Sequence, residues 1–81
     1  MEITFRLFAS LRQITGTTRW TVDLPEGATL RQAVDHLLIQ YPVLAHNRPL
    51  WHYAVNQTHV AEDTARHDGD QVSIFPYIAG G

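Results

Sequence analysis

One segment alone has the periodicity of a long helix, and it limits the folds open to this chain. Apolar residues recur from residue 30 onward at the three- and four-residue spacing of one helix face, namely Leu30, Ala33, Val34, Leu37, Leu38 and Tyr41. Thr29 and Gln32 have the spacing of a capping box, which predicts that the helix begins at Leu30. Pro42 predicts that it ends near Gln40. With a single long helix, the chain needs β-strands to complete a core.

Strand patterns lie on both sides of this helix. Ile3, Phe5 and Leu7 alternate with polar residues, which is typical of a half-buried strand, and Phe8 is expected to pack at the strand end. The other expected segments are a helical turn at 9–14 with Leu11 and Ile14 on its apolar side, strands at 17–24, 51–55 and 72–75, a short segment at 59–60, and irregular chain at 43–50 and 61–67.

This order of segments predicts an α+β fold. We expect one main helix across one face of a mixed sheet, with the first two strands forming an antiparallel hairpin. The first strand would pair in parallel with the last, so that the last strand lies at the centre of the sheet. The 81 residues are expected to form a single domain, 1–81, with residues 77–81 as an extended C-terminal tail.

Composition excludes several classes of function. The chain is 44% hydrophobic and 17% charged, which is typical of a globular protein and leaves room for one core. Its net charge of −2 predicts no general affinity for nucleic acid. No apolar run has transmembrane length and no signal peptide is evident, so we expect no membrane partner and a cytoplasmic location.

Two residue types are missing from the chain. There is no cysteine, and therefore no disulfide, no cysteine metal site and no thiol nucleophile. All six basic residues are arginine, so no side-chain amine is available for building isopeptide-linked chains. If this protein handles sulfur, the sulfur has to be carried on the terminus.

The C-terminal residues are the most informative stretch for function. After the strand at 72–75, Pro76 stops regular pairing, and Tyr77, Ile78, Ala79, Gly80 and Gly81 follow. Such a thin arm suits a tunnel in a partner protein, with the terminal carboxylate of Gly81 as the reactive group after activation. The alternatives are a frayed terminus or a cloning remnant. Apolar Tyr77 and Ile78 favour the partner tunnel.

Phe75 is a candidate anchor for that partner, together with Pro76. Val72 and Ile74 share the core side of the last strand, whereas Phe75 alternates to the other side, beside the exit of the tail. The competing interpretation is that a loop partly covers the second face of the sheet.

Other constellations point to no chemistry within the chain. Five histidines are present, but none lies at metal-ligand spacing, so we expect surface histidines and no metal site. Glu62 and Asp63 could act as a general acid and base, yet neighbouring residues on a loop are usually solvated. No nucleotide-binding motif occurs, so no cofactor is expected to bind stably, and a partner would use ATP to activate Gly81.

Together these pieces resemble the MoaD/ThiS family of sulfur carriers, which have the ubiquitin-like β-grasp fold. The resemblance spans the chain: the Arg6–Arg12 stretch followed by Gly16, the Ala54–Thr58 stretch, Asp68-Gly69-Asp70, Phe75-Pro76 and Gly80-Gly81. The first two favour the small subunit of molybdopterin synthase over the thiazole-pathway carrier. Tyr77-Ile78-Ala79 departs from close relatives, which often have Pro, an aliphatic residue and a small polar one.

The resemblance implies a carrier cycle. An adenylating enzyme of the MoeB type joins AMP to Gly81, and a persulfide donor then supplies sulfur to form a thiocarboxylate. The tail enters the large, MoaE-like subunit of molybdopterin synthase, which contributes the catalytic groups, and the sulfur passes to the pterin precursor. The alternatives are a thiazole-pathway or other sulfur carrier, a ubiquitin-like protein modifier, and a passive interaction module.

Overall fold

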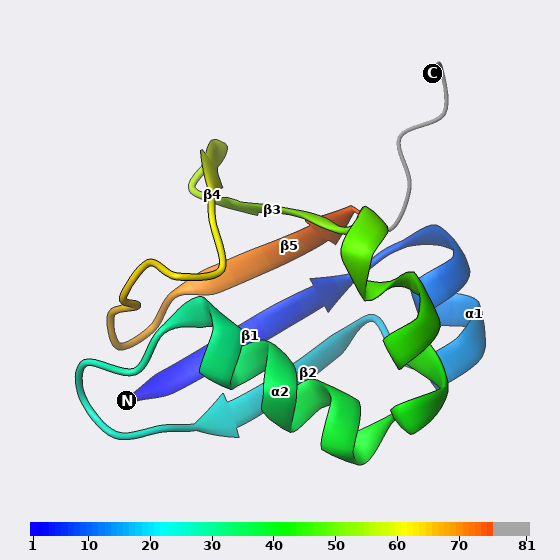
Figure 1. Ribbon diagram of the computed structural model, residues 1–81, viewed down its shortest axis with the longest axis horizontal. Helices are drawn as coiled ribbons and strands as arrows, with labels where there is room; N and C mark the ends of the chain where they lie inside the picture. Colours follow the sequence, from blue (N-terminus) through cyan, green and yellow to red (C-terminus); the bar gives the residue numbers. More distant parts are fainter. Residues whose placement is uncertain (76–81) are drawn as a thin grey trace.

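A computed structural model of the chain describes residues 1–75, which form one five-stranded mixed sheet with helices on one side (Figure 1). Along the sheet the strands lie in the order β2-β1-β5-β3-β4. In chain order the elements are β1 (Glu2–Leu7), α1 (Ala9–Thr15), β2 (Arg19–Asp23), α2 (Leu30–Gln40), the 3₁₀ helix η1 (Pro42–Leu50), β3 (His52–Val55), β4 (Thr58–Val60) and β5 (Gln71–Phe75). The expected α+β architecture is confirmed.

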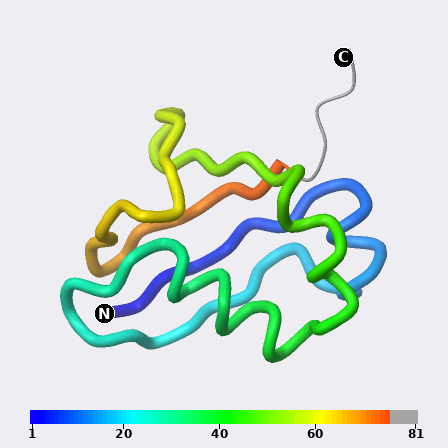
Figure 2. Tube along the Cα trace, viewed as in Figure 1, coloured from blue at the N-terminus to red at the C-terminus, as the bar shows by residue number. Residues whose placement is uncertain are grey.

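The last strand of the described chain occupies the centre of the sheet. β5 pairs in parallel with β1, where Leu7 lies opposite Ile74, and antiparallel with β3, where His52 lies opposite Phe75. β1 also pairs antiparallel with β2 as the predicted hairpin. Figure 2 shows β1 and β5 running side by side through the middle of the molecule. The C-terminal end of β5 at Phe75 therefore lies in the middle of the sheet and not at its edge.

Helix α2 closes the core on one face of the sheet. Its capping box is complete, because the Thr29 hydroxyl accepts from the Gln32 amide while the Gln32 side chain accepts from the Thr29 amide. The helix buries an apolar face against the sheet, and these core residues are fully or almost fully buried: Leu30, Ala33, Val34 and Leu37 from α2, with Ile3, Phe5, Leu7, Val72 and Ile74 from the two central strands. The apolar face that this periodicity predicted thus shares one core with the two central strands.

The sheet has a second face that no helix formed by residues 1–75 covers. Along β5, Val72 and Ile74 are buried whereas Gln71 and Phe75 are exposed, so the expected alternation is confirmed. We call this second surface the open face. In β1 and β2 the open face carries cross-strand pairs, such as Thr4 and Thr21, whose hydroxyl oxygens lie 3.0 Å apart.

Two local expectations were wrong. Residues 43–50, expected to be irregular, belong to the 3₁₀ helix η1, which packs beside α2 and buries Leu44. The helical turn is α1, which is capped by Gly16 in the left-handed conformation (φ 75°), but of its two expected apolar residues only Leu11 is buried and Ile14 is 44% exposed. No helix within residues 1–75 combines the length and the apolar character that crossing a membrane requires.

Candidate docking face and carrier terminus

The predicted reactive end follows directly from β5. That strand ends at Phe75, so Pro76, Tyr77, Ile78, Ala79, Gly80 and Gly81 lie outside the described residues. What the structure describes is the surface around the point where they begin. This surface lies at the ends of β1 and β5 that carry Leu7 and Phe75.

Phe75 is one of two stacked rings at this point. Its ring lies 5.9 Å from that of Phe8, centroid to centroid, with only 5° between the ring planes. The side chains are 40% and 39% exposed, respectively. Phe75 therefore packs against the ring of Phe8, the single residue that connects β1 to α1, and the outward position predicted for Phe75 is confirmed. Its function as a partner anchor stays a prediction.

Sequence reasoning missed the part that Phe8 takes in this surface. Phe8 comes just after the end of β1, where the alternation of inward and outward residues no longer assigns a side. Arg6 adds to the same surface, because its guanidinium carbon lies 6.0 Å from the centroid of the Phe8 ring. The only sequence signal was that Phe8 is the one aromatic residue of the Arg6–Arg12 stretch.

Two histidines extend this surface toward the other edge of the sheet. His52 lies opposite Phe75 in the pairing of β3 with β5, and its ring is 6.1 Å from that of His59 on β4. The sequence predicted surface histidines; both are exposed, and they are neighbours in space. No group of three or more potential ligands that could hold a metal ion occurs among residues 1–75. We call Phe8, Phe75, His52 and His59 together the ring row.

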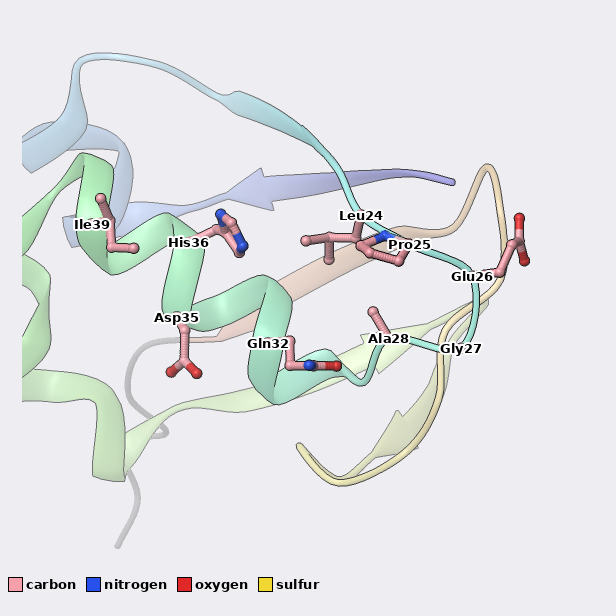
Figure 3. A pocket seen from close by; sticks show the side chains of 9 residues that line it. All are labelled: Leu24, Pro25, Glu26, Gly27, Ala28, Gln32, Asp35, His36 and Ile39. Atoms are coloured by element: carbon pink, nitrogen blue, oxygen red, sulfur yellow. The ribbon is translucent and has the colours of Figure 1, made fainter.

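An open groove of about 480 Å³ lies elsewhere, between the turn after β2 and α2 (Figure 3). It is lined by side chains from both segments, including Leu24, Ala28, His36 and Ile39. Leu24 exchanges backbone hydrogen bonds with Met1, at the start of β1, so this groove lies at the opposite end of the sheet from Phe75. It cannot contribute to the surface around the exit of the chain.

Glu62 corrects a further expectation, since it is not a loosely solvated loop residue. It accepts hydrogen bonds from Arg48, at 3.2 Å from Nε and 3.0 Å from Nη2, and from the hydroxyl of Tyr53. Burial alone would raise the pKa of Glu62, but these hydrogen bonds outweigh it and the pKa lies below its ordinary value. Burial and the Glu62 carboxylate raise the pKa of Tyr53. The carboxylate is thus a structural anion and not a poised general base.

A mixed sheet with its first and last strands parallel at the centre and one long helix across one face is the ubiquitin-like β-grasp fold. The protein belongs to the ThiS family, whose model matches residues 5–81. The matched range includes the Gly80-Gly81 pair and the whole of the described sheet apart from the first residues of β1.

Proteins that are similar to this chain over its whole length fall into two groups by name. A molybdopterin synthase sulfur carrier subunit from Arabidopsis thaliana is 31% identical over 81 residues, which covers 100% of this chain and 84% of that protein. Small archaeal modifier protein 3 from Haloferax volcanii is 33% identical over 94 residues, with both chains fully covered. The proteins similar to this chain therefore include ones named as sulfur carriers and ones named as modifiers.

Solved structures agree with the assignment of the fold. SAMP1 from Haloferax volcanii superimposes with a TM-score of 0.85 at 27% identity, with 100% of both chains covered. A chain in the complex of subunits 1 and 2 of molybdopterin-converting factor from Helicobacter pylori gives a TM-score of 0.70 at 20% identity, again with both chains fully covered. At that identity the likeness to the Helicobacter pylori chain shows the fold alone.

Proposed function

We propose that this protein is the sulfur carrier subunit of a molybdopterin synthase, with the α-carboxyl group of Gly81 as the carrier. The observation that supports this most strongly is the similarity over the entire chain to proteins named as sulfur carrier subunits of that enzyme. The chain has no cysteine, so no side chain can carry a persulfide, and a carrier function has to use the backbone carboxyl.

The proposed chemistry begins with activation. A carboxylate oxygen of Gly81 attacks the α-phosphorus of ATP on the MoeB-type adenylating enzyme, forming an acyl-adenylate and releasing pyrophosphate. The terminal sulfur of a persulfide donor then attacks the acyl carbon and displaces AMP, which gives an acyl disulfide. A thiol reductant cleaves the sulfur–sulfur bond and leaves the thiocarboxylate. ATP is thus consumed by the partner, and this chain holds no cofactor of its own.

Delivery is the second half of the proposal. Residues 77–81 enter a tunnel in the MoaE-like large subunit, where the thiocarboxylate sulfur attacks the pterin precursor and water finally returns Gly81 to a carboxylate. The acids and bases for these steps come from the large subunit. Phe75 and Pro76, joined by Phe8, dock on that subunit; the exposed stack of Phe75 on Phe8 beside the exit of the chain supports this part.

A second candidate function is a protein modifier, in which Gly81 is transferred from the adenylate to a lysine amine of a target. The similarity to small archaeal modifier protein 3 favours it. Activation is the same in both cases, and the two functions differ only in whether sulfur or an amine displaces AMP. A thiazole-pathway carrier would share the sulfur chemistry and differ in the acceptor.

Intact-protein mass spectrometry separates these functions. The protein is incubated with the adenylating enzyme, ATP and a persulfide donor with thiol. Sulfur carriage predicts a mass change equal to one sulfur replacing one oxygen, located on the C-terminal peptide. A modifier would instead gain an amide link to a foreign lysine. No change, or a change located on another peptide, would contradict the carrier proposal.

Substitutions at the terminus sharpen the test. Gly81→Ala should slow loading severely, since a misplacement of about 1 Å at a reacting carbon can cost on the order of a hundredfold in rate. Adding one residue after Gly81 should abolish loading. Deleting Gly80 and Gly81 should also abolish it while leaving thermal stability nearly unchanged, because the core consists of residues between Ile3 and Ile74.

A further inference from the structure

Two arginines face each other on the open face, and no carboxylate of residues 1–75 compensates their charge. Arg6 of β1 lies directly opposite Arg19 of β2, and both are exposed. Like charges in directly opposite positions of a sheet are destabilising. Neither side chain has a carboxylate within 4.0 Å among residues 1–75. The described residues therefore contain no salt bridge that would offset the repulsion between Arg6 and Arg19.

Three of the other four arginines have carboxylate partners, whereas Arg12 of α1 has none within 4.0 Å among residues 1–75. Arg31 and Arg48 contact Glu62, and Arg66 contacts Asp70 at 3.5 Å. The chain thus supplies carboxylates to arginines that hold the structure together, whereas Arg6 and Arg19 receive none from the described residues.

Acidic and basic side chains on the open face lie at opposite ends of the β1–β2 hairpin. At the far end of the β1–β2 hairpin, Glu2 lies opposite Asp23, and at the near end Arg6 lies opposite Arg19. The paired threonines lie between the two ends. The near end is the one that adjoins Phe8 and the end of β5. A positive area therefore lies beside the point where the chain leaves the sheet.

This positive area is continuous with the stacked phenylalanines. The Arg6 guanidinium lies over the Phe8 ring at 6.0 Å, and Phe8 stacks on Phe75. Across the sheet the order is therefore Arg19, Arg6, Phe8 and Phe75, followed by His52 and His59. We call Arg6 and Arg19 the arginine flank. Continuity with the ring row makes the flank part of one surface and not an isolated pair of charges.

We propose that the arginine flank recognises carboxylates on the protein that accepts the chain's C-terminal residues. That partner would present acidic side chains beside an apolar pocket for Phe8 and Phe75. This inference rests on the proposed docking of the same face on the large subunit. Carboxylates opposite the flank would relieve the repulsion between Arg6 and Arg19 and would direct the encounter electrostatically before the rings are buried.

Charge and shape favour a protein over a nucleic acid as the partner. The chain carries a net charge of −2, so the positive area is local. The rings of Phe8 and Phe75 stack on each other, so that each already has one face covered, whereas single-stranded nucleic acids need free ring faces for stacking.

Stopped-flow measurements of association with the purified large subunit test the proposal, using the full-length chain at several salt concentrations. Arg6→Gln and Arg19→Gln each remove one charge from the flank. Arg31→Gln is the matched control, because it removes one charge from an exposed arginine at the start of α2, on the other side of the sheet. Arg19→Lys keeps the charge and is the rescue variant.

We expect the Arg6→Gln/Arg19→Gln double variant to associate about tenfold more slowly at low salt, with a smaller change in dissociation and a weaker dependence on salt than the native chain. Arg31→Gln and Arg19→Lys should stay within about twofold of the native rate.

Three results would overturn the proposal. The first is equal rates for the double variant and for Arg31→Gln while Phe75→Ala still weakens binding, which would leave the docking face in place but remove the acidic partner surface. The second is binding of the flank to single-stranded RNA in preference to the large subunit. Failure of every variant and of the native chain to bind the large subunit would overturn both this inference and the proposed docking, whereas loading of sulfur on Gly81 is measured independently.

Discussion

Arg48 binds both carboxylate oxygens of Glu62, although the two residues belong to segments that do not pair in the sheet. Nε and Nη2 of the guanidinium donate to Oε2 and Oε1 at 3.2 and 3.0 Å, and Nη1 donates to Asp35 at 2.7 Å. One side chain thus connects η1 to α2 and to the loop after β4. Both partners of the main pair are mostly shielded, with 23% and 20% of their side-chain surface exposed.

Arg48→Met should destabilise the protein by about 1–3 kcal/mol, because it leaves a half-buried carboxylate without its charged donor. Chemical denaturation at neutral pH measures the change. Arg12→Met is the control, since Arg12 is an exposed arginine with no salt bridge among the described residues. Equal stability of the two variants would show that the Arg48 contacts contribute nothing.

Acid should remove the stability that the ionised Glu62 supplies. The pKa of Glu62 lies below its ordinary value of 4.5 in the folded protein, so its contribution is complete above about pH 4.5 and is lost as the pH falls toward the lower, folded-state pKa. Unfolding free energies measured from pH 7 to pH 3 should therefore fall less steeply for Glu62→Gln than for the native chain. Parallel curves would exclude this carboxylate as a source of the acid dependence.

Leu37→Ala should cost roughly 2–5 kcal/mol, as expected for a fully buried leucine. The side chain lies on the face of α2 that packs on the sheet, far from the open face. Where the variant is folded, we expect sulfur loading of Gly81 at the native rate, measured by the mass change described above. A loading defect in folded Leu37→Ala protein would show that core packing and loading are coupled.

Phe75→Ala should weaken binding to the large subunit by about 2 kcal/mol or more, as is typical for an aromatic residue at the centre of an interface. Phe8→Ala should have a comparable effect, because each ring holds the other in place. Ile39→Ala is the matched control, since Ile39 is 75% exposed and lies on α2. Calorimetry gives the affinities, and thermal unfolding checks that all three variants remain folded.

Local signals account for the parts of the fold that could be predicted from the sequence. The capping box and apolar periodicity place α2 at Leu30–Gln40, because hydrogen bonds between near neighbours determine where such a helix begins. The central position of β5 followed from the order of strands and helix. In contrast, η1 was expected to be irregular, since Pro49 and Asn47 suggest a break and a 3₁₀ helix lacks the apolar spacing of an α-helix.

The candidate site was only partly predictable, because its contacts join residues far apart in the chain. Alternation along β5 placed Phe75 on the open face, but its contact with Phe8 exists only once β1 and β5 are paired. Glu62 looked solvated beside Asp63, and its partners Arg48 and Tyr53 meet it only when η1, β3 and the loop come together. The predictions for Pro76 to Gly81 concern residues outside those that the structure describes.

The central position of β5 also determines how the protein responds to mechanical force. β5 is hydrogen-bonded along its length to β1 on one side and to β3 on the other. A pull that acts on Phe75 along the axis of β5 runs across both rows of hydrogen bonds, so the bonds share the load in shear. A strand at the sheet edge, pulled sideways, would lose its bonds one after another. A domain pulled in this direction is therefore expected to resist mechanical unfolding.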